Sequence, residues 1–197
     1  MSNRKATVTR KTKETDISLN FSLDGNGGGE IVTGIGFFNH MLDSFARHGL
    51  FDLDVAVVGD LHVDDHHTVE DVGIVLGQAI AQGIGDKAGI KRFGSVILPM
   101  DETLMLCALD LSGRPYYKSD VVFNSEFVGE MKTEMIKEFF YAVATNSGMN
   151  LHFKILDGEN SHHIVEAMFK SFGKALDIAT QKEDRIKDAW STKGGLA

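Results

Sequence analysis

Polar and apolar positions alternate along residues 6–23, in the stretch ATVTRKTKETDISLNFSL. Alternation with a period of two predicts antiparallel strands that bury one face. Residues 24–31, DGNGGGEI, interrupt the alternation with glycine and asparagine. This composition favours a hairpin loop over a phosphate-binding loop, because the glycine spacing matches neither the P-loop nor the dinucleotide-binding pattern.

Apolar residues then recur at helical spacing. Residues 36–50 predict a helix that ends near a glycine, and residues 51–61 alternate again as a strand. Residues 64–87 predict a long helix, for which Asp64 or Asp65 is the expected N-cap. The first half of the chain therefore has the order strands, helix, strand, helix.

The second half of the chain repeats this order. Strand patterns cover residues 95–123 and 149–158, and helical patterns cover residues 132–148 and 160–181. The two histidine pairs, His66-His67 and His162-His163, lie 96 residues apart and set the alignment of the halves. A difference of two residues in one loop then places His40 opposite Glu138. Such self-similarity predicts an internal duplication.

The predicted fold class is α+β. Each half is expected to form a mostly antiparallel four-stranded sheet with two helices on one face, a ribosomal protein S5 domain 2-like arrangement. The predicted repeats are residues 1–92 and residues 93–197, the second including a C-terminal tail. The chain has two prolines and no low-complexity linker, so we expect the repeats to form one compact unit.

Composition narrows the function classes. Apolar residues make up 43% of the 197 residues and charged residues 24%, which is typical of a soluble globular protein. No apolar run could cross a bilayer, the N-terminal residues lack a secretory h-region, and Cys107 has no partner for an intrachain disulfide. We expect a cytoplasmic protein. A net charge of −8 argues against nucleic-acid binding but permits a small anionic substrate.

Two copies of the pattern HHxxE carry the candidate chemistry. Residues four apart share a helix face, so the pattern pairs His66 with Glu70 and His162 with Glu166. The adjacent histidine of each pair points about 100° away. One copy alone would be an ordinary pair of side chains on an exposed helix. Two copies at equivalent positions of a duplication indicate metal binding.

Eight potential ligands arise once His40 and Glu138 are added to the two motifs. Eight ligands suffice for two metal ions with coordination positions left open, which suits catalysis. Ligand chemistry alone allows zinc, iron, nickel or copper, whereas manganese prefers more oxygen. The residues therefore predict a dinuclear centre without selecting the metal.

Several longer stretches resemble the imidazoleglycerol-phosphate dehydratase family over nearly the whole chain. They are TGIGFFNHML, DDHHTVEDVGIVLG, GIKRFGS, DLSGRPYY, NSHHIVEAMFKSF and STKG. The resemblance implies a monofunctional hydro-lyase that converts D-erythro-imidazoleglycerol phosphate into imidazole acetol phosphate in L-histidine biosynthesis. It also implies two Mn²⁺ ions per chain and an imidazolate form of the substrate bound to both.

The resemblance also implies roles for individual residues. The metal ligands would be His40, His66, His67, Glu70, Glu138, His162, His163 and Glu166. Glu138 stands where the family usually has histidine, and Asn39 where it more often has aspartate. The catalytic residues would be Glu14, His66, Glu70, His162 and Glu166. Substrate and phosphate contacts would come from Glu14, His40, His48, His66, Arg92, Arg114, His162, Lys170, Ser191, Thr192 and Lys193.

The family assembles as a homo-24-mer built from trimers, a hollow shell with active sites between subunits. Two other classes of function remain open from the sequence. One is a metal-dependent hydrolase acting on a phosphorylated small molecule or on nucleic acid. The other is a metal-storage shell of the ferritin type, although such proteins are helix bundles and the strand patterns here argue against it.

Overall fold

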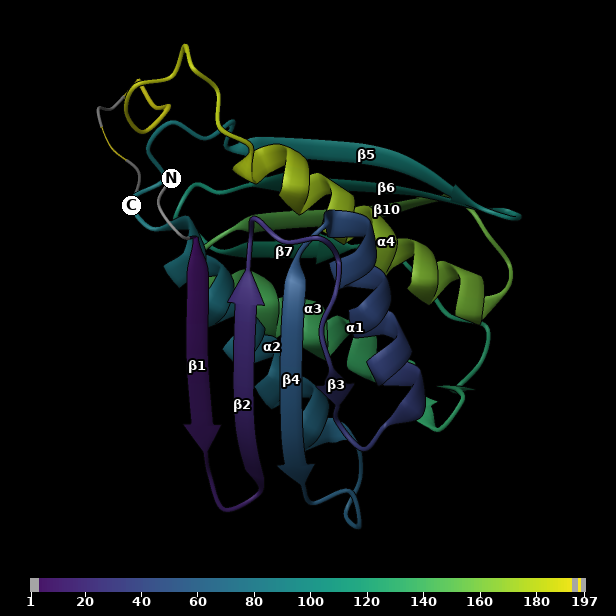
Figure 1. Cartoon of the computed structure of the whole chain (residues 1–197). Coiled ribbons are helices and arrows are strands. Elements are labelled where there is room, and N and C mark those ends of the chain that lie inside the picture. The colour runs from purple at the N-terminus through teal and green to yellow at the C-terminus, as the bar shows by residue number, and fades with distance from the viewer. Residues whose placement is uncertain (1–3, 193–194, 196–197) are drawn as a thin grey trace.

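The computed structural model describes residues 4–192 and residue 195, with two four-stranded sheets and four helices between them (Figure 1). The first sheet has the order β1-β2-β4-β3. Its strands are β1 (Lys5–Lys11), β2 (Thr15–Ser22), β4 (Asp52–Gly59) and β3 (Ile31–Val32). The first three strands pair antiparallel, and β3 joins β4 in parallel.

The second sheet repeats this topology in the order β5-β6-β10-β7, again with one parallel strand at the end. Its strands are β5 (Phe93–Met100), β6 (Thr103–Asp110), β10 (Asn150–Asp157) and β7 (Tyr116–Ser119). The predicted duplicated α+β fold is confirmed. The division at residues 92 and 93 falls between the sheets and stays a prediction about the repeats.

A small hairpin of β8 (Phe127–Val128) and β9 (Met131–Lys132) was not predicted from the sequence. Its strands have two residues each, too few to show a period.

The helices connect the two halves of the chain. They are α1 (Gly36–Gly49), α2 (His66–Ile84), α3 (Glu134–Ser147) and α4 (Ser161–Thr180). Helix α2 covers β1 and β2, and α4 covers β5 and β6, while α1 packs on α4 and α3 packs on α2. Helices α2 and α4, which cover the two sheets, therefore each pack against a helix from the other half of the chain. Along the described residues, no helix is long and apolar enough to cross a membrane.

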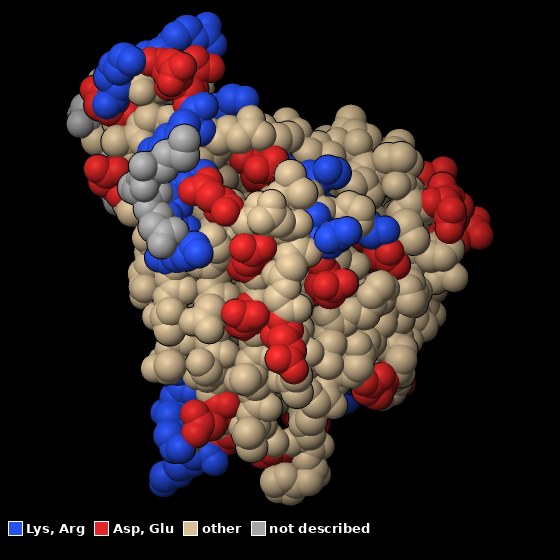
Figure 2. Space-filling model, viewed as in Figure 1, with Lys and Arg blue, Asp and Glu red and all other residues tan. Residues whose placement is uncertain are grey.

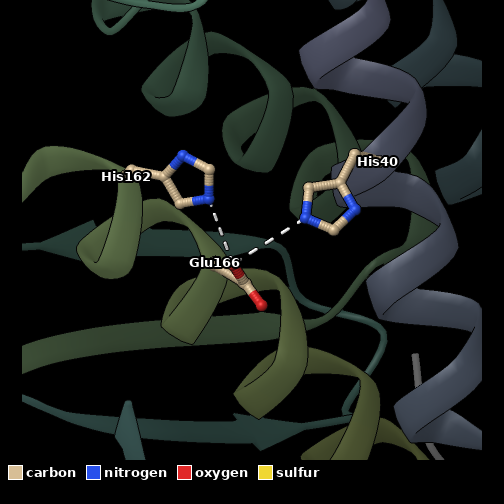
Figure 3. Close-up of side chains that lie close together, drawn as sticks. All are labelled: His40, His162 and Glu166. Atoms are coloured by element: carbon tan, nitrogen blue, oxygen red, sulfur yellow. Dashed lines mark hydrogen bonds and ion pairs between the residues drawn. The ribbon is translucent and has the colours of Figure 1, made fainter. Parts of the chain in front are cut away.

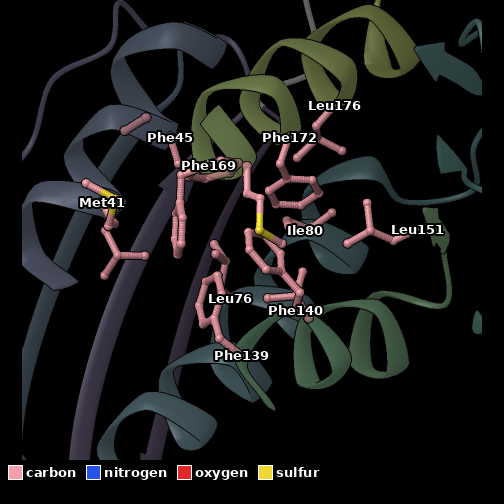
Figure 4. Close-up of a cluster of buried hydrophobic side chains, with 14 of the residues drawn as sticks. Met41, Phe45, Leu76, Ile80, Phe139, Phe140, Leu151, Phe169, Phe172 and Leu176 are labelled. Carbon is pink, nitrogen blue, oxygen red and sulfur yellow. The ribbon is translucent and has the colours of Figure 1, made fainter. Parts of the chain in front are cut away.

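Phenylalanine side chains fill the space between the helices (Figure 4). Phe139 and Phe169 stack with ring centroids 5.1 Å apart, and Phe45 and Phe172 stack at the same separation. All four are almost completely buried, and each contributes about 1.5–3 kcal/mol to stability through removal of apolar surface from water. The core thus continues across both halves.

Glycine allows α1 and α4 to approach closely. A Cβ atom on Gly173 of α4 would lie 2.5 Å from the carbonyl oxygen of Phe45 in α1, and one on Gly49 would lie 3.0 Å from the carbonyl oxygen of Gly173. A Cβ atom on Gly77, the residue 96 positions before Gly173, would lie 2.7 Å from the carbonyl oxygen of Val143 in α3. Both helix pairs therefore depend on a glycine at the same repeat position.

Substitution Gly173→Ala should separate α1 from α4. Forcing a methyl group against backbone costs about 1–3 kcal/mol, because neither helix can move without disturbing the core. The free energy of unfolding, measured by chemical denaturation, should fall by this amount. Gly28→Ala is the control, since the nearest atom to its added Cβ is 4.0 Å away. Equal stability of the two variants would contradict the close approach.

Candidate metal centre

The start of α1 is held by residues distant in sequence. Ile35 stands at the N-cap position, where its apolar side chain cannot accept a hydrogen bond. The Glu130 carboxylate accepts hydrogen bonds from the backbone N–H groups of Gly36 and Phe37 instead. A carboxylate in this position also interacts favourably with the helix dipole. It fixes the first turn, and the His40 side chain projects from the start of the next turn.

Asn39 supports the loop before the same helix. Its Oδ1 accepts hydrogen bonds from the backbone N–H of Thr33 at 2.9 Å and from the Thr33 hydroxyl at 2.6 Å. Asn39 therefore fixes the entry of the chain into α1.

The start of α4 is capped by Asn160. Its side-chain oxygen accepts hydrogen bonds from the backbone N–H groups of His162 at 2.9 Å and His163 at 3.4 Å. This is the usual role of asparagine at an N-cap. The cap places both histidines in the first turn and His162 directly above Glu166.

Three side chains from the two helices meet at the crossing (Figure 3). The Oε2 atom of Glu166 lies 3.2 Å from Nε2 of His162 and 3.8 Å from Nε2 of His40. Among the described residues this is the one group of three whose ligand atoms all lie within 4.8 Å of one another. Two imidazoles and a carboxylate suit a divalent cation, and the 51% exposure of the His40 side chain leaves one side open for further ligands.

The second oxygen of Glu166 binds a lysine. Oε1 lies 2.5 Å from Nζ of Lys170, one helical turn further along α4. Burial opposes ionisation of Glu166, whose side chain is 10% exposed. The hydrogen bond and the charge of Lys170, together with the charges of the two histidines, outweigh burial and hold the pKa of Glu166 below its usual value.

His67 and His163 do not belong to the cluster, and each contacts a carboxylate. Nδ1 of His67 lies 3.0 Å from Asp60, and Nδ1 of His163 lies 2.7 Å from Glu102. These hydrogen bonds raise the pKa of both histidines. A carboxylate bound to Nδ1 orients the ring and leaves Nε2 for a metal, as is common in metalloproteins.

Glu14 and Glu102 occupy equivalent places, each one residue before the second strand of its sheet. Oε1 of Glu14 lies 3.9 Å from Nε2 of His67, and its side chain is half exposed. Glu102 is instead held by the backbone N–H groups of Asn160 at 2.9 Å and Glu159 at 3.3 Å. These bonds and the one to His163 lower the pKa of Glu102 to about 2.

The family resemblance suggested Glu14, whereas neither it nor the residue pattern suggested Asp60 or Glu102. A repeated Glu-Thr pair at residues 14–15 and 102–103 was the available signal for Glu102.

The equivalent site of the first half is more open. Nε2 of His66 lies 3.6 Å from Glu70, whose side chain is 43% exposed. Glu138 belongs to no three-residue group in the described part of the chain. It lies near Tyr117, whose pKa is raised to about 12 by burial and by the Glu138 charge.

The predicted N-cap of α2 is confirmed in position but not in its hydrogen bond. Asp65 occupies its N-cap position, but the carboxylate makes no cap and instead accepts a hydrogen bond from the Lys132 backbone at 2.8 Å. The His66 backbone N–H donates to Asp64.

Cationic side chains lie near the cluster. Burial lowers the pKa of His48 near the end of α1, and the charges of Lys170, Lys174 and Arg47 lower it further. Figure 2 shows Lys and Arg side chains gathered over the crossing of α1 and α4. One chain therefore places His48 and Lys170, two of the predicted phosphate ligands, in the same region.

The other predicted phosphate ligands lie elsewhere. The Arg92 guanidinium binds both oxygens of Asp110, at 2.6 and 3.0 Å, and the Arg92 backbone N–H bonds Ala179 at the end of α4. Ala179 lies 17 residues after His162, about 25 Å along the helix. Arg114 and Thr192 are exposed and Ser191 is half-buried, whereas Lys193 lies outside the described residues.

The fold and the site together define a class: a duplicated α+β protein with a candidate metal centre where its two halves meet. The family model for imidazoleglycerol-phosphate dehydratase matches residues 33–176. The chain belongs to the imidazoleglycerol-phosphate dehydratase family, hydro-lyases of histidine biosynthesis that act on a phosphorylated imidazole substrate.

Similar proteins agree over nearly the whole length. The imidazoleglycerol-phosphate dehydratase of Lachnoclostridium phytofermentans is 62% identical over 192 residues, which is 98% of each chain. That of Acetivibrio thermocellus is 61% identical and covers 98% of this chain and 99% of its own. The Staphylococcus aureus crystal structure is 38% identical with a TM-score of 0.83, covering 91% of this chain and 99% of its own. The Pyrococcus furiosus structure is 39% identical with the same score, covering 96% and 100%.

Substitution Glu102→Gln should weaken metal binding by His163. The amide keeps an oxygen for the backbone N–H groups but loses the carboxylate that orients the imidazole. Loss of such a partner costs about 10- to 100-fold in metal affinity. Titration of the metal-free protein with Mn²⁺ measures the change. Asp101→Asn is the control for charge, because the Asp101 carboxylate lies on the same turn but 3.6 Å from Nε2 of His163 and not at Nδ1; an equal loss there would indicate a general charge effect.

Proposed function

We propose that this chain dehydrates D-erythro-imidazoleglycerol phosphate to imidazole acetol phosphate, with two Mn²⁺ ions per chain. The observation that carries the proposal is the cluster of His40, His162 and Glu166, with Lys170 one turn away. A metal-binding end and a cationic end suit a substrate with an imidazole ring at one end and a phosphate at the other. Membership of the family supplies the reaction.

The proposed metal ligands are those predicted from the sequence. His40, His162 and Glu166 would hold one ion, and the other predicted ligands would complete the two sites. Bound manganese would supply Lewis-acid stabilisation of the deprotonated imidazole ring. This stabilisation is needed because the carbon that loses its proton has no neighbouring carbonyl to accept the electrons, so the ring must accept them.

The spacing along α4 supports the orientation of the substrate. One turn, about 5.4 Å, separates Glu166 from Lys170, and another separates Lys170 from Lys174. Lys170 and the neighbouring His48 would bind the phosphate, and the open side of the cluster would receive the ring. We further propose that Arg92, Arg114 and the segment Ser191–Lys193 contribute phosphate contacts from neighbouring subunits.

We propose Glu14 as the acid–base residue. Its backbone is fixed, because its N–H donates to Thr12 at 3.0 Å and its carbonyl accepts from Asp60 at 3.1 Å. The carboxylate itself is half exposed and close to His67, so it can accept a proton from the substrate carbon and return it to solvent or to product. The departing hydroxyl takes up one proton, which balances the proton removed from carbon, and leaves as water; the resulting enol rearranges to the ketone.

The proposed assembly is a homo-24-mer of trimers with active sites between subunits. The position of His67 and His163 outside the cluster and the distance of Arg92 from it support completion of each site by other chains. Exposed apolar side chains on the sheets, such as Val58 and Ile97, supply surface for such contacts. Ligands shared between chains would make metal-binding energy part of assembly energy.

The metal-loaded protein should form the ketone from imidazoleglycerol phosphate. Glu14→Gln should lower kcat by about 10²- to 10⁴-fold, because a positioned acid–base group typically contributes this factor. The metal content should be unchanged. Asp16→Asn removes a nearby exposed carboxylate and should retain activity. Release of inorganic phosphate in place of ketone would indicate a hydrolase and contradict the proposal.

Removal of metal should dissociate the assembly. We expect about two ions per chain in the loaded state and collapse of the large particle after treatment with a chelator. Elemental analysis combined with light scattering measures both quantities on one sample. A full-size particle that persists without metal would contradict the shared-ligand arrangement.

A further inference from the structure

The two halves differ beside their equivalent glutamates. Lys170 follows Glu166 by one turn, whereas Ile74 stands at the corresponding position after Glu70, 96 residues earlier. The exposure of the glutamates differs in the same direction, with the Glu166 side chain 10% exposed and that of Glu70 43% exposed. Only the buried carboxylate of the duplicated pair has a lysine.

Burial explains why Glu166 needs this partner. A carboxylate removed from water loses much of its hydration and is stable as an ion only with compensating charge or hydrogen bonds. Oε2 faces the two imidazoles, and Oε1 faces Nζ of Lys170 at 2.5 Å. The lysine is itself mostly buried, and its Nζ also lies 3.6 Å from the thioether sulfur of Met100. In the metal-free chain the ammonium group of Lys170 is thus the cation that neutralises Glu166.

The same ammonium group is needed for the phosphate if the proposed function holds. The charges of Lys170 and Lys174 both lower the pKa of His48. Lys170 therefore borders the cationic region as well as the metal cluster. A lysine in close contact with a carboxylate is a weak phosphate ligand, because its charge is already compensated. Lys170 must therefore separate from Glu166 before it can bind the phosphate strongly.

We propose that the metal releases Lys170, so that this residue links the metal cluster to phosphate binding. Before metal binds, Lys170 neutralises Glu166. A divalent cation at His40, His162 and Glu166 takes over that neutralisation, and the freed ammonium turns towards the phosphate of the substrate. The phosphate half of this inference rests on the proposed function; the competition between Lys170 and the metal for Glu166 does not.

Competition predicts tighter metal binding without the lysine. Lys170→Met should increase the affinity of the cluster for Mn²⁺ by roughly three- to tenfold, the scale of one partly buried ion pair. Titration of the chelator-treated protein without substrate measures it, and loss of the signal in His40→Ala identifies the ion concerned. Lys170→Arg should restore wild-type affinity, and circular dichroism should show that each variant is folded.

Lys174→Met is the matched control. It removes the same charge from the same helix one turn further on, where Nζ lies 3.5 Å from the carbonyl of His48 and not beside Glu166. A general electrostatic effect would shift Mn²⁺ affinity equally in both variants. Equal shifts, unchanged affinity or weaker binding in Lys170→Met would each overturn the inference.

Inorganic phosphate tests the second half. Linkage requires that a metal which promotes phosphate binding is itself bound more tightly in the presence of phosphate. Mn²⁺ should strengthen phosphate binding in the wild type, and Lys170→Met should lose most of that gain while Lys174→Met keeps it. An equal gain in Lys170→Met would overturn the release. Absence of dehydratase activity in the metal-loaded wild type would overturn the proposed function. The competition between Lys170 and Mn²⁺ for Glu166 would still stand if Lys170→Met bound Mn²⁺ more tightly.

Discussion

The contact between α1 and α4 is the constraint on which the site depends. His40 comes from the first half of the chain, and His162 and Glu166 come from the second. They meet because glycine lets the two helix backbones touch and because Glu130, 94 residues away from Gly36, fixes the start of α1. A separation of even one methyl group at this crossing would move an imidazole out of reach of the carboxylate, because the core on either side is closely packed.

Much of the fold is local and could be predicted from the sequence. Alternation over residues 6–23 predicted β1 and β2, and the helical period predicted α1 and α4 almost to the residue. The crossing of helices between halves leaves no such signal, because α1 would show the same apolar face whichever helix it packed against. Likewise, the cap supplied by Glu130 depends on long-range contacts that no spacing rule includes.

The candidate site divides in the same way. The i,i+4 rule predicted that His162 pairs with Glu166 and His66 with Glu70, since both pairs lie within one helix. The contact of His40 with His162 and Glu166 depends on tertiary structure, as does the hydrogen bond between His67 and Asp60. Repeat symmetry made His40 and Glu138 equivalent, yet the structure gives them different surroundings. Duplicated positions thus share geometry without sharing neighbours.

The presence of a lysine after only one of the two glutamates affects the orientation in which a ligand can bind. If two identical halves faced one pocket, the pocket would have twofold symmetry. An unsymmetrical molecule could then bind in either of two orientations with equal energy. Half of the encounters would present the wrong carbon to the base. Ile74 and Lys170 make the two halves chemically different at this position, so such a molecule would meet a cation on one side alone.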